Sequence, residues 1–338
     1  MRFGWRGAIG VVISAVLLWW TLRGEDLGRI WSVLSHSNGA LWLACAFFAT
    51  LIFPLRARRW EALLEPVVGR RIHFRSLWHS TAVGMMVNNV APARAGEFAR
   101  AFALSRQEPD VKFTAAFASL AVDRLFDGTV VLLLMVAAML DPAFARRNAD
   151  SGALLISMRF AAVFLGAVLA VLALLVWAPA RMFAMYDGTV GRLMPRLARK
   201  GRHLLEGFAS GLGVLRSPRL LGEVFFWTVL HWLCNAFAFW LGFRALDIDV
   251  PASAALLLQG IIAIGVAVPS SPGFFGVFEA TGKIGLGLYG VPSNAAVSWA
   301  IGFHVLSYIP ITIIGAWYLT RLKLHLRDFS GTGSPPAA

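Results

Sequence analysis

Polar and charged residues interrupt the apolar sequence at two places, and the first of these has the composition of an anion site. It runs from Gly84 to Glu97, and its polar or helix-breaking residues are Asn88, Asn89, Pro92, Arg94, Gly96 and Glu97, with Arg100 one turn later. A helix that restarts near Glu97 directs its positive N-terminal end toward the break, where Arg94 and Arg100 add two guanidinium groups. This pattern predicts a site for an anion such as a lipid phosphate. The alternative is a cytoplasmic turn with ordinary arginines and a glutamate at a helix start.

Three charged residues, Asp123, Arg124 and Asp127, then follow within one predicted helix. If that helix begins near Thr114, Asp123 lies roughly 14 Å along the axis at about 1.5 Å per residue. Charges at such depth are expensive in a bilayer and mark a pathway or a buried site. Arg124 is therefore a candidate head-group ligand and an aspartate a candidate proton-coupling group. The alternative is a structural cluster in which Arg124 neutralises Asp127 three residues away.

The second interruption, from Gly265 to Glu279, repeats the order of apolar segment, break and glutamate. Its break contains Pro269, Ser270, Ser271, Pro272, Gly273 and Gly276. The functional interpretation places the hydroxyls of Ser270 and Ser271, with exposed backbone groups, at a tip opposite the first break. The structural alternative is a local ion pair, because Lys283 follows Glu279 by four residues in the favourable orientation.

Two further polar pairs lie in apolar runs at helical spacing. His304 and Tyr308 are four residues apart in the last apolar run, and we expect them to lie on the helix face that packs against the second break. His231 and Asn235 form a similar pair in the preceding span. We include His304 and Tyr308 among the candidate site residues. The alternative role for such residues is interhelical hydrogen bonding, worth under about 1 kcal/mol each.

The elements that must position these residues are membrane-spanning helices. Of the 338 residues, 58% are hydrophobic and only 14% are charged, with a mean hydropathy of +0.68, which is too apolar for a soluble domain of this length. Candidate spans cover about 8–22, 40–55, 114–140, 154–178, 220–245 and 294–320, and the interrupted segments cover about 76–105 and 253–290. The sequence predicts an all-α polytopic membrane protein with about six full transmembrane helices and two broken, re-entrant helical hairpins.

The distribution of basic residues predicts the orientation. Arginine and lysine concentrate between 56 and 75, between 179 and 219, and after 320, whereas the loop 246–252 holds two aspartates and no base. The positive-inside rule places the three basic regions and both termini in the cytoplasm. One interrupted segment then enters from each side, and the order of elements occurs twice in opposite orientations. This predicts inverted repeats at about 5–140 and 154–322, although each hairpin can alternatively cross fully as two thin spans.

The sequence predicts one integral membrane domain, 1–329, followed by a disordered tail, 330–338. The apolar run Ala8–Leu22 resembles a signal peptide but lacks a small-residue cleavage site after it, so we interpret it as an uncleaved first helix. The two cysteines, Cys45 and Cys234, lie in apolar runs and are expected to pack as small hydrophobic groups.

The formal net charge of +13 does not indicate nucleic-acid binding. The basic residues cluster between apolar runs, where anionic lipid head groups select them, and no basic soluble domain accompanies them. The expected partners are therefore membrane lipids.

Three motifs in order resemble the flippase-like membrane domain of lysyl-phosphatidylglycerol synthases, which also occurs as stand-alone bacterial and archaeal membrane proteins. They are Asn89–Glu97 with Arg100, Asp123-Arg124 with Asp127, and Pro269–Glu279, and the resemblance covers nearly the whole chain. It implies a lipid translocase in the bacterial inner (cytoplasmic) membrane, without cofactor or metal. The implied cargo is an anionic phospholipid, a glycolipid or a hopanoid-type lipid. A lipid-synthesis enzyme and further copies of the chain remain open as partners.

Two positions depart from the family pattern. Asp123 stands where the family commonly has glutamate, and Pro272-Gly273-Phe274 replaces Pro-Gly-Gly, which gives a bulkier tip. The soluble domain that performs aminoacyl transfer in the bifunctional enzymes is not part of this sequence, so the resemblance does not extend that activity to it.

Three other functions remain as alternatives. A membrane-embedded transferase for glycosyl or aminoacyl groups would use Asp247 and Asp249 as a metal-binding pair, although a solvated turn explains them as well. An intramembrane serine protease would pair Ser271 with His304, but Pro272 removes the adjacent backbone donor. An accessory subunit of a lipid-modification pathway would need no chemistry of its own.

Overall fold

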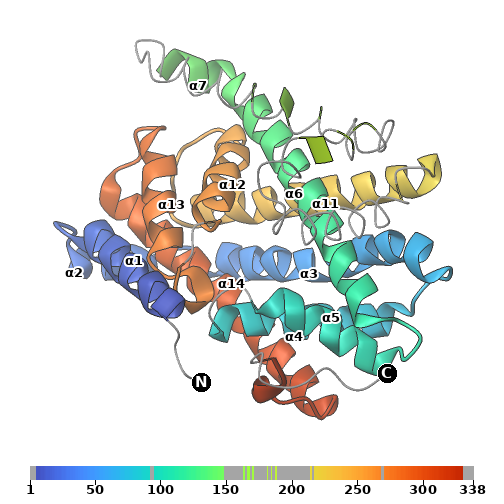
Figure 1. Ribbon diagram of the computed structural model, residues 1–338. Helices are drawn as coiled ribbons and strands as arrows, with labels where there is room; N and C mark the ends of the chain where they lie inside the picture. Colours follow the sequence, from blue (N-terminus) through green and yellow to red (C-terminus); the bar gives the residue numbers. More distant parts are fainter. Residues whose placement is uncertain are drawn as a thin grey trace.

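The computed structural model describes residues 5–91, 95–147, 217–267 and 270–329, together with isolated positions between 163 and 214 (Figure 1). The predicted span at 154–178 and the predicted tail at 330–338 lie outside the described residues, apart from isolated positions in the former. The described helices are α1 (Trp5–Leu22), α2 (Leu27–Ser35), α3 (Gly39–Val68), α4 (Phe74–Val90), α5 (Gly96–Gln107), α6 (Phe113–Met139), α7 (Pro142–Arg147), α11 (Pro218–Ala245), α12 (Ser253–Gly265), η2 (Pro272–Phe274), α13 (Val277–Gly287), α14 (Ser293–Arg321) and η3 (Leu326–Phe329). Together they form an all-α membrane protein, as predicted.

Helix length and composition identify the spans. Within the described ranges, α3, α11 and α14 are long and apolar enough to cross a membrane, with 30, 28 and 29 residues. Helix α6 has 27 residues but carries three charged side chains near its middle. Two shorter apolar helices, Ile9–Leu22 and Ser253–Gly265, complete the apolar set.

Helices α3 and α11 form the antiparallel centre of the bundle (Figure 1). At one end the Asn38 N–H donates to the Ala245 carbonyl, at 3.0 Å. Between the ends, the Cys45 thiol contacts the Ala238 carbonyl at 3.2 Å. Cys45 and Cys234 are both buried and free, as the sequence predicted.

Helix α3 corrects the predicted span at 40–55. It starts at an Asn38 cap, whose side chain accepts from the Leu41 N–H, and it continues to Val68, where Gly69 ends it with a φ of 78°. Arg56 and Arg59, assigned from sequence to a cytoplasmic connection, therefore lie inside the helix and are buried. The prediction failed because carboxylates on another helix allow these arginines to remain in the bundle.

Both interrupted segments form helical hairpins whose arms are short. The arms α4 and α5 have 17 and 12 residues, and α12 and α13 have 13 and 11. A span needs about 20 residues, so no arm reaches that length. In the first hairpin Gly84 and Gly96 pack in direct contact, which brings the two backbones together.

The hairpins open toward opposite ends of the bundle. Arg70, before α4, binds both Glu108 and Asp110, after α5, at 2.8 Å. This is the end at which α3 finishes and α11 starts. At the other end Ser253, which begins α12, donates to Asp141 after α6, at 2.5 Å. The tips meet inside the bundle, because η2 of the second break packs against α4 of the first.

Candidate functional site

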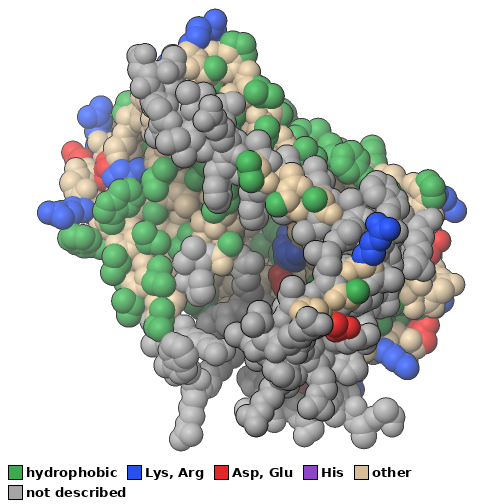
Figure 2. Space-filling model, turned by 45° about the horizontal axis from the view of Figure 1, so that its top comes forward, with side chains coloured by type: hydrophobic (Ala, Val, Ile, Leu, Met, Phe, Trp, Pro, Cys, Tyr) green, Lys and Arg blue, Asp and Glu red, His purple; other side chains and the backbone are tan. Residues whose placement is uncertain are grey.

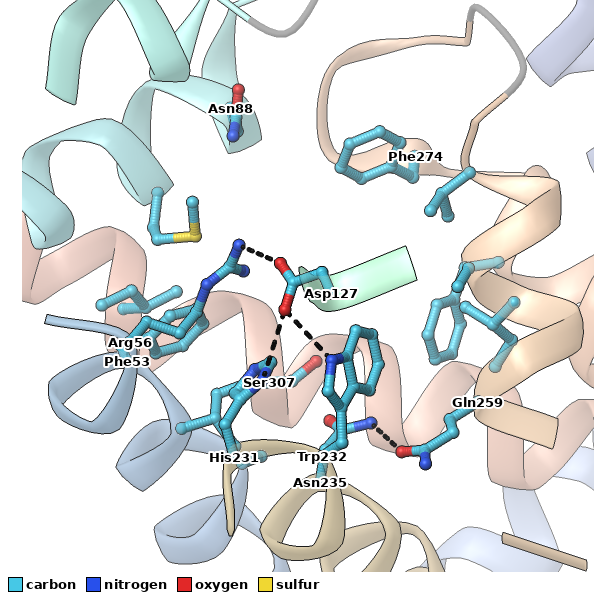
Figure 3. Close-up of a pocket in the computed structure, with 18 of the residues that line it drawn as sticks. Phe53, Arg56, Asn88, Asp127, His231, Trp232, Asn235, Gln259, Phe274 and Ser307 are labelled. Atoms are coloured by element: carbon cyan, nitrogen blue, oxygen red, sulfur yellow. Dashed lines mark hydrogen bonds and ion pairs between the residues drawn. The ribbon is translucent and has the colours of Figure 1, made fainter. Parts of the chain in front are cut away.

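A cavity of about 400 Å³ lies between the two breaks, inside the bundle. Figure 3 shows Arg56, Asp127, His231 and Trp232 on one side of it, with Phe274 across from them. The apolar lining includes Phe53, Met85, Phe239, Phe274, Phe278 and Phe303. On the outside, Figure 2 shows a hollow with basic and acidic side chains at its base below hydrophobic ones. The cavity is therefore amphiphilic.

The apolar wall belongs to the hydrophobic core of the protein. Phe278 stacks on Phe303 with ring centroids 5.9 Å apart, and Phe239 packs against Phe303 at 4.6 Å. Behind them Trp299 is fully buried. Three helices, α11, α13 and α14, thus fix this wall through ring contacts worth roughly 0.5–1.5 kcal/mol each beyond area burial.

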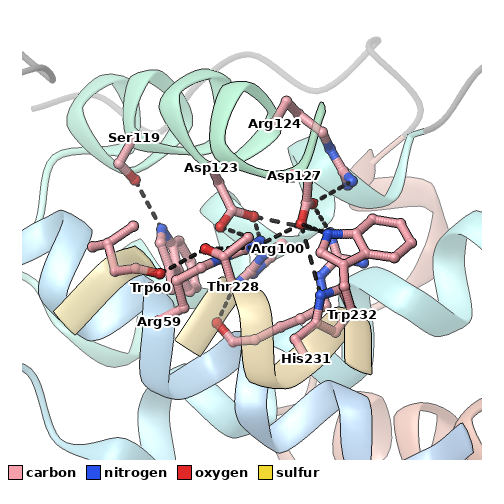
Figure 4. Close-up of polar contacts among 12 residues, drawn as sticks. Arg59, Trp60, Arg100, Ser119, Asp123, Arg124, Asp127, Thr228, His231 and Trp232 are labelled. Carbon is pink, nitrogen blue, oxygen red and sulfur yellow. Dashed lines mark hydrogen bonds and ion pairs between the residues drawn. The ribbon is translucent and has the colours of Figure 1, made fainter. Parts of the chain in front are cut away.

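An ion cluster on α3 and α6 forms the polar wall (Figure 4). Arg59 pairs with Asp123 at 2.5 Å and with Asp127 at 2.6 Å, and Arg56 pairs with Asp127 at 3.1 Å. The side chain of Arg59 is completely inaccessible. The spacing explains the match: Arg56 and Arg59 are three residues apart on one helix face, and Asp123 and Asp127 are four apart on the other.

Helix α5 adds Arg100 behind the cavity. Its guanidinium lies 3.3 Å from Asp123, 3.4 Å from the Arg56 carbonyl and 4.1 Å from the ring centroid of Trp60. The Trp60 indole in turn donates to Ser119 of α6, at 2.8 Å. Arg100 is 1% exposed, so its role is to bind three helices together.

Arg56 and Arg124 both line the cavity, and Arg124 is the more exposed of the two. It binds Glu97 at 2.8 Å and Asp127 at 3.4 Å. Its side chain is 36% exposed and that of Glu97 is 26% exposed. Both residues line the cavity. Glu97 and Arg124 therefore form an accessible ion pair, whereas the pairs of Arg59 with Asp123 and Asp127 are buried.

Asp127 joins the buried cluster to the cavity. Besides the arginines it accepts a hydrogen bond from the Trp232 indole at 3.0 Å, and His231 lies 3.8 Å from the same oxygen (Figure 3). Both aromatic residues come from α11. A carboxylate with this many donors keeps a fixed position.

The cluster as described carries a formal excess of positive charge. Four arginines face the three carboxylates of Glu97, Asp123 and Asp127, which leaves one positive charge if His231 is counted as neutral. The Nε atoms of Arg56, Arg59 and Arg100 also lack hydrogen-bond partners within the described residues. Such a site favours an anion.

The opposite side of the cavity ties both breaks to α14. His304 Nδ1 lies 2.5 Å from Glu279 Oε1, and His304 Nε2 lies 2.8 Å from the Gly273 carbonyl. One turn later the Tyr308 hydroxyl donates to the Asn89 carbonyl, at 3.2 Å. The Asn89 side chain donates in turn to Thr312 of α14, at 2.7 Å. The two breaks are thus joined through one helix.

The structure brings together most of the residues predicted from sequence. Those that line the cavity are Asn88, Asn89, Glu97, Arg124, Asp127, Gly273, His304 and Tyr308. Arg100, Asp123 and Glu279 lie behind this lining and support it. Arg94, together with Pro92 and Pro269, lies outside the described residues.

The local ion pair of Glu279 and Lys283, which was the structural alternative from sequence, does not form. Glu279 caps its own helix by accepting the Gly276 N–H, at 2.6 Å, and its other oxygen contacts His304. Lys283 instead binds Glu25, at 2.7 Å, and the Thr21 carbonyl, at 3.0 Å. Capping directs the glutamate toward the break, while the long lysine side chain reaches the end of α1.

Ser270 and Ser271 contact α1 and are not among the cavity-lining residues. The Ser271 N–H donates to the Ser14 hydroxyl, at 2.8 Å, and the backbone of Ser270 lies against Gly10. The Ser271 hydroxyl donates to the Phe275 carbonyl, at 3.3 Å, while both ring nitrogens of His304 have other contacts. The serine and histidine therefore do not form the hydrogen-bonded pair that a protease would need.

Sequence reasoning missed Arg56, Arg59, Trp232 and Gln259 as members of the site, and it noted His231 without including it. The available signal was the spacing of Arg56 and Arg59, which continues the helical pattern of the preceding apolar run. No group of three or more His, Cys, Asp or Glu side chains able to hold a metal occurs in the described part of the chain, and Asp247 and Asp249 are exposed.

Comparison with known proteins adds to this geometry. The chain is 20% identical to a UPF0104 membrane protein of Methanocaldococcus jannaschii over 96% of this chain and 98% of that protein. It is 24% identical to a UPF0104 membrane protein of Methanothermobacter thermautotrophicus over 78% of each. A third match, 30% identical, to the glycosyltransferase AglD of Haloferax volcanii covers 35% of this chain and only 19% of that protein. The model for the lysylphosphatidylglycerol synthase TM region matches residues 7–315, which is nearly the whole chain, and the protein therefore belongs to that family of membrane domains.

Proposed function

We propose that this protein is a lipid translocase that moves a polar-headed lipid across the inner membrane. The observation that carries the proposal is the amphiphilic cavity of about 400 Å³ between two broken hairpins. Its size falls within the roughly 300–1,000 Å³ of small-ligand sites, which suits a head group while the acyl chains stay in the bilayer. Polar groups at membrane depth next to broken helices are the usual composition of a transport site.

The proposed head-group ligand is Arg124, assisted by the formal excess of positive charge around it. Arg124 is the more accessible arginine of the cluster, whereas Arg59 and Arg100 are almost completely inaccessible. A guanidinium can bind a phosphate through two parallel hydrogen bonds. The proposed cargo is accordingly a lipid with an anionic or phosphate-bearing head group, and Asn88 and Asn89 provide further hydrogen bonds near the first break.

We further propose that the two halves form an inverted repeat. The contact of α4 with α14 has a counterpart in that of α12 with α6, and the contacts within the two hairpins correspond in the same way. With α3 and α11 antiparallel at the centre, the hairpins enter from opposite sides as re-entrant elements. We place the end that carries Arg70 and Arg71, and both termini, in the cytoplasm.

Reconstitution tests the proposal. Purified protein in liposomes is given fluorescent phosphatidylglycerol, and a membrane-impermeant quencher added outside follows the movement of labelled lipid between leaflets. We expect wild type to exceed protein-free liposomes, and Arg124→Ala to be slower by about tenfold or more, because a charge-assisted hydrogen bond contributes roughly 1.5–3 kcal/mol. Arg70→Ala is the matched control, since Arg70 is 41% exposed and binds Glu108 and Asp110 outside the cavity.

Equal rates for wild type, Arg124→Ala and protein-free liposomes, with all proteins folded, would refute the translocase. The alternative is a membrane-embedded transferase or an accessory subunit of a lipid-modification pathway. The partial match to a protein named as a glycosyltransferase favours the transferase over other enzyme classes. Formation of a glycosylated lipid from an activated sugar by the purified protein would support it.

A further inference from the structure

His304 and Glu279 have a hydrogen-bonding geometry that requires a bound proton. His304 Nε2 lies 2.8 Å from the Gly273 carbonyl oxygen, and Nδ1 lies 2.5 Å from Glu279 Oε1. A carbonyl oxygen can only accept, so Nε2 must carry hydrogen. The short contact on the other side then needs a second hydrogen between Nδ1 and the carboxyl group.

Two proton arrangements satisfy both contacts. In one, an imidazolium faces a carboxylate; in the other, a neutral imidazole accepts from a carboxylic acid. Each holds one proton more than a neutral histidine beside a carboxylate, and each has no net charge. The second oxygen of Glu279 remains an acceptor for the Gly276 N–H, at 2.6 Å, in both arrangements.

Loss of that proton breaks one contact. A carboxylate retains an N–H donor at Nδ1, because this hydrogen bond is charge-assisted. Nε2 then presents a lone pair to the carbonyl of Gly273, and two acceptors 2.8 Å apart repel one another. The contact that is lost is therefore the hydrogen bond between the Gly273 carbonyl, at the tip of the second break, and His304 of α14.

The backbone at the tip has an unusual conformation that depends on its surroundings. Gly273 has a φ of 71° and Phe274, which is not glycine, has a φ of 62°. A left-handed backbone at a bulky residue persists only where surrounding contacts hold it. Phe274 also lines the cavity, so a displaced tip changes access to it.

We propose that His304 and Glu279 bind a proton that keeps the Gly273 carbonyl hydrogen-bonded to α14, a contact that we call the latch. Loss of this proton opens the side of the cavity that Phe274 lines. The first break stays in place, because the Tyr308 hydroxyl holds Asn89 in either state. His304 lines the cavity, which gives the proton its route to and from water. The latch concerns the cavity of the proposed translocase but does not require that lipid moves through it.

The residues around His304 and Glu279 separate this pair from other titratable side chains. On α13 the nearest base, Lys283, is bound to Glu25, and α1 presents Gly10 and Ser14 to the break. The rings of Phe275 and Phe278 cover the imidazole, with centroids 4.6 and 4.7 Å away. The charged or titratable groups elsewhere on the cavity are Arg56, Glu97, Arg124, Asp127 and His231, with Tyr308 on α14 itself.

Cysteine labelling tests the latch. In a background with Cys45→Ala and Cys234→Ala, a Phe274→Cys protein reports the tip and a Val131→Cys protein reports an α6 position on the same cavity. The ratio of their rates with a small water-soluble maleimide removes the intrinsic effect of pH on thiols. We expect this ratio to rise at least about fivefold between about pH 5 and about pH 8, the interval in which histidine side chains in general gain or lose a proton.

Three variants separate the latch from a structural role. Glu279→Gln keeps an acceptor for Gly276 and donates to Nδ1, as the carboxylic acid does, so the labelling ratio should stay low at every pH. His304→Ala should give a high ratio at every pH, and Lys283→Gln should keep the wild-type profile. A flat ratio in wild type, or an unchanged profile in Glu279→Gln, would overturn the proposal. Because the ratio reports the tip directly, it remains informative if lipid translocation is not observed.

Discussion

Arg59 of α3 and Asp123 of α6 form an ion pair 2.5 Å long in which the side chains are 0% and 1% exposed. The pair joins the central helix of the bundle to the helix that carries the accessible Arg124. Taking two charges out of water is expensive, and good geometry with further hydrogen bonds is what offsets that cost. The buried Arg59–Asp123 pair thus holds in place the helix that carries the accessible Arg124.

Arg59→Met should destabilise the protein by about 3–5 kcal/mol, because it leaves Asp123 and Asp127 buried with one cation fewer. Thermal unfolding of purified protein in detergent, followed by circular dichroism, measures the effect. Arg71→Met is the matched control. Arg71 is 40% exposed and pairs with Glu65 and Glu223 at the end of the bundle, so its loss should cost no more than about 1 kcal/mol. Equal losses in the two variants would show that burial of the pair is unimportant.

Gly84→Ala should separate the arms of the first hairpin. A Cβ at Gly84 would lie 2.7 Å from the Gly96 carbonyl oxygen and 2.8 Å from Arg100 Cβ, so α5 must shift. We expect a loss of about 1–3 kcal/mol, typical of overpacking. Gly222→Ala on α11 meets nothing within 4 Å and should be neutral or stabilising by up to about 1 kcal/mol. Unfolding in detergent compares the two, and a neutral Gly84→Ala would contradict the close packing.

The sequence alone predicted the class of fold and several of the residues that line the cavity. Composition and run length were sufficient for an all-α membrane protein, because hydrophobic length is set by the bilayer. Asp123, Arg124 and Asp127 stood out because charge inside an apolar run is costly and therefore informative. Pro and Gly marked the breaks because both residues interrupt a helix locally.

Long-range pairing was not predictable in the same way. Arg56 and Arg59 looked like residues of a basic connection, because the carboxylates that retain them lie 64 and 71 positions later, on α6. Lys283 looked like the partner of Glu279, yet Glu25 on a distant segment competes for it. Both errors arise where tertiary contacts override a local charge pattern.

Acid should loosen the end of the first hairpin. Burial raises the pKa of Glu108, but hydrogen bonds from the Ser76 hydroxyl and from Arg70 outweigh it, so the pKa lies below its usual value of 4.5. Because the folded-state pKa is depressed, the stabilisation is present above that usual value and is lost as pH falls through the folded-state value. The unfolding temperature of Glu108→Gln should therefore fall less than that of wild type between about pH 5 and about pH 3.

The control for this prediction is Asp247→Asn, a change in the exposed loop before α12. Its acid response should match that of wild type. The stabilisation that Glu108 loses in acid should be below about 1 kcal/mol, because Arg70 is 41% exposed and its ion pairs are screened by solvent. An identical acid response in Glu108→Gln and wild type would argue against a contribution from this contact.

Removing the charge of Glu97 should strengthen the binding of anionic lipids. Glu97 holds Arg124 at 2.8 Å and neutralises it, so Glu97→Gln leaves the arginine free to bind a head group and adds one formal positive charge to the cluster. We expect short-chain phosphatidylglycerol to bind about threefold to tenfold more tightly to the purified variant, with little change for phosphatidylcholine. Glu223→Gln, which removes a carboxylate from an ion pair at the end of the bundle, should change neither affinity. The double variant Glu97→Gln with Arg124→Gln should lose the gain, because the added affinity requires the guanidinium. Equal tightening for both lipids would indicate a general effect on the protein surface and would count against Arg124 as the head-group ligand.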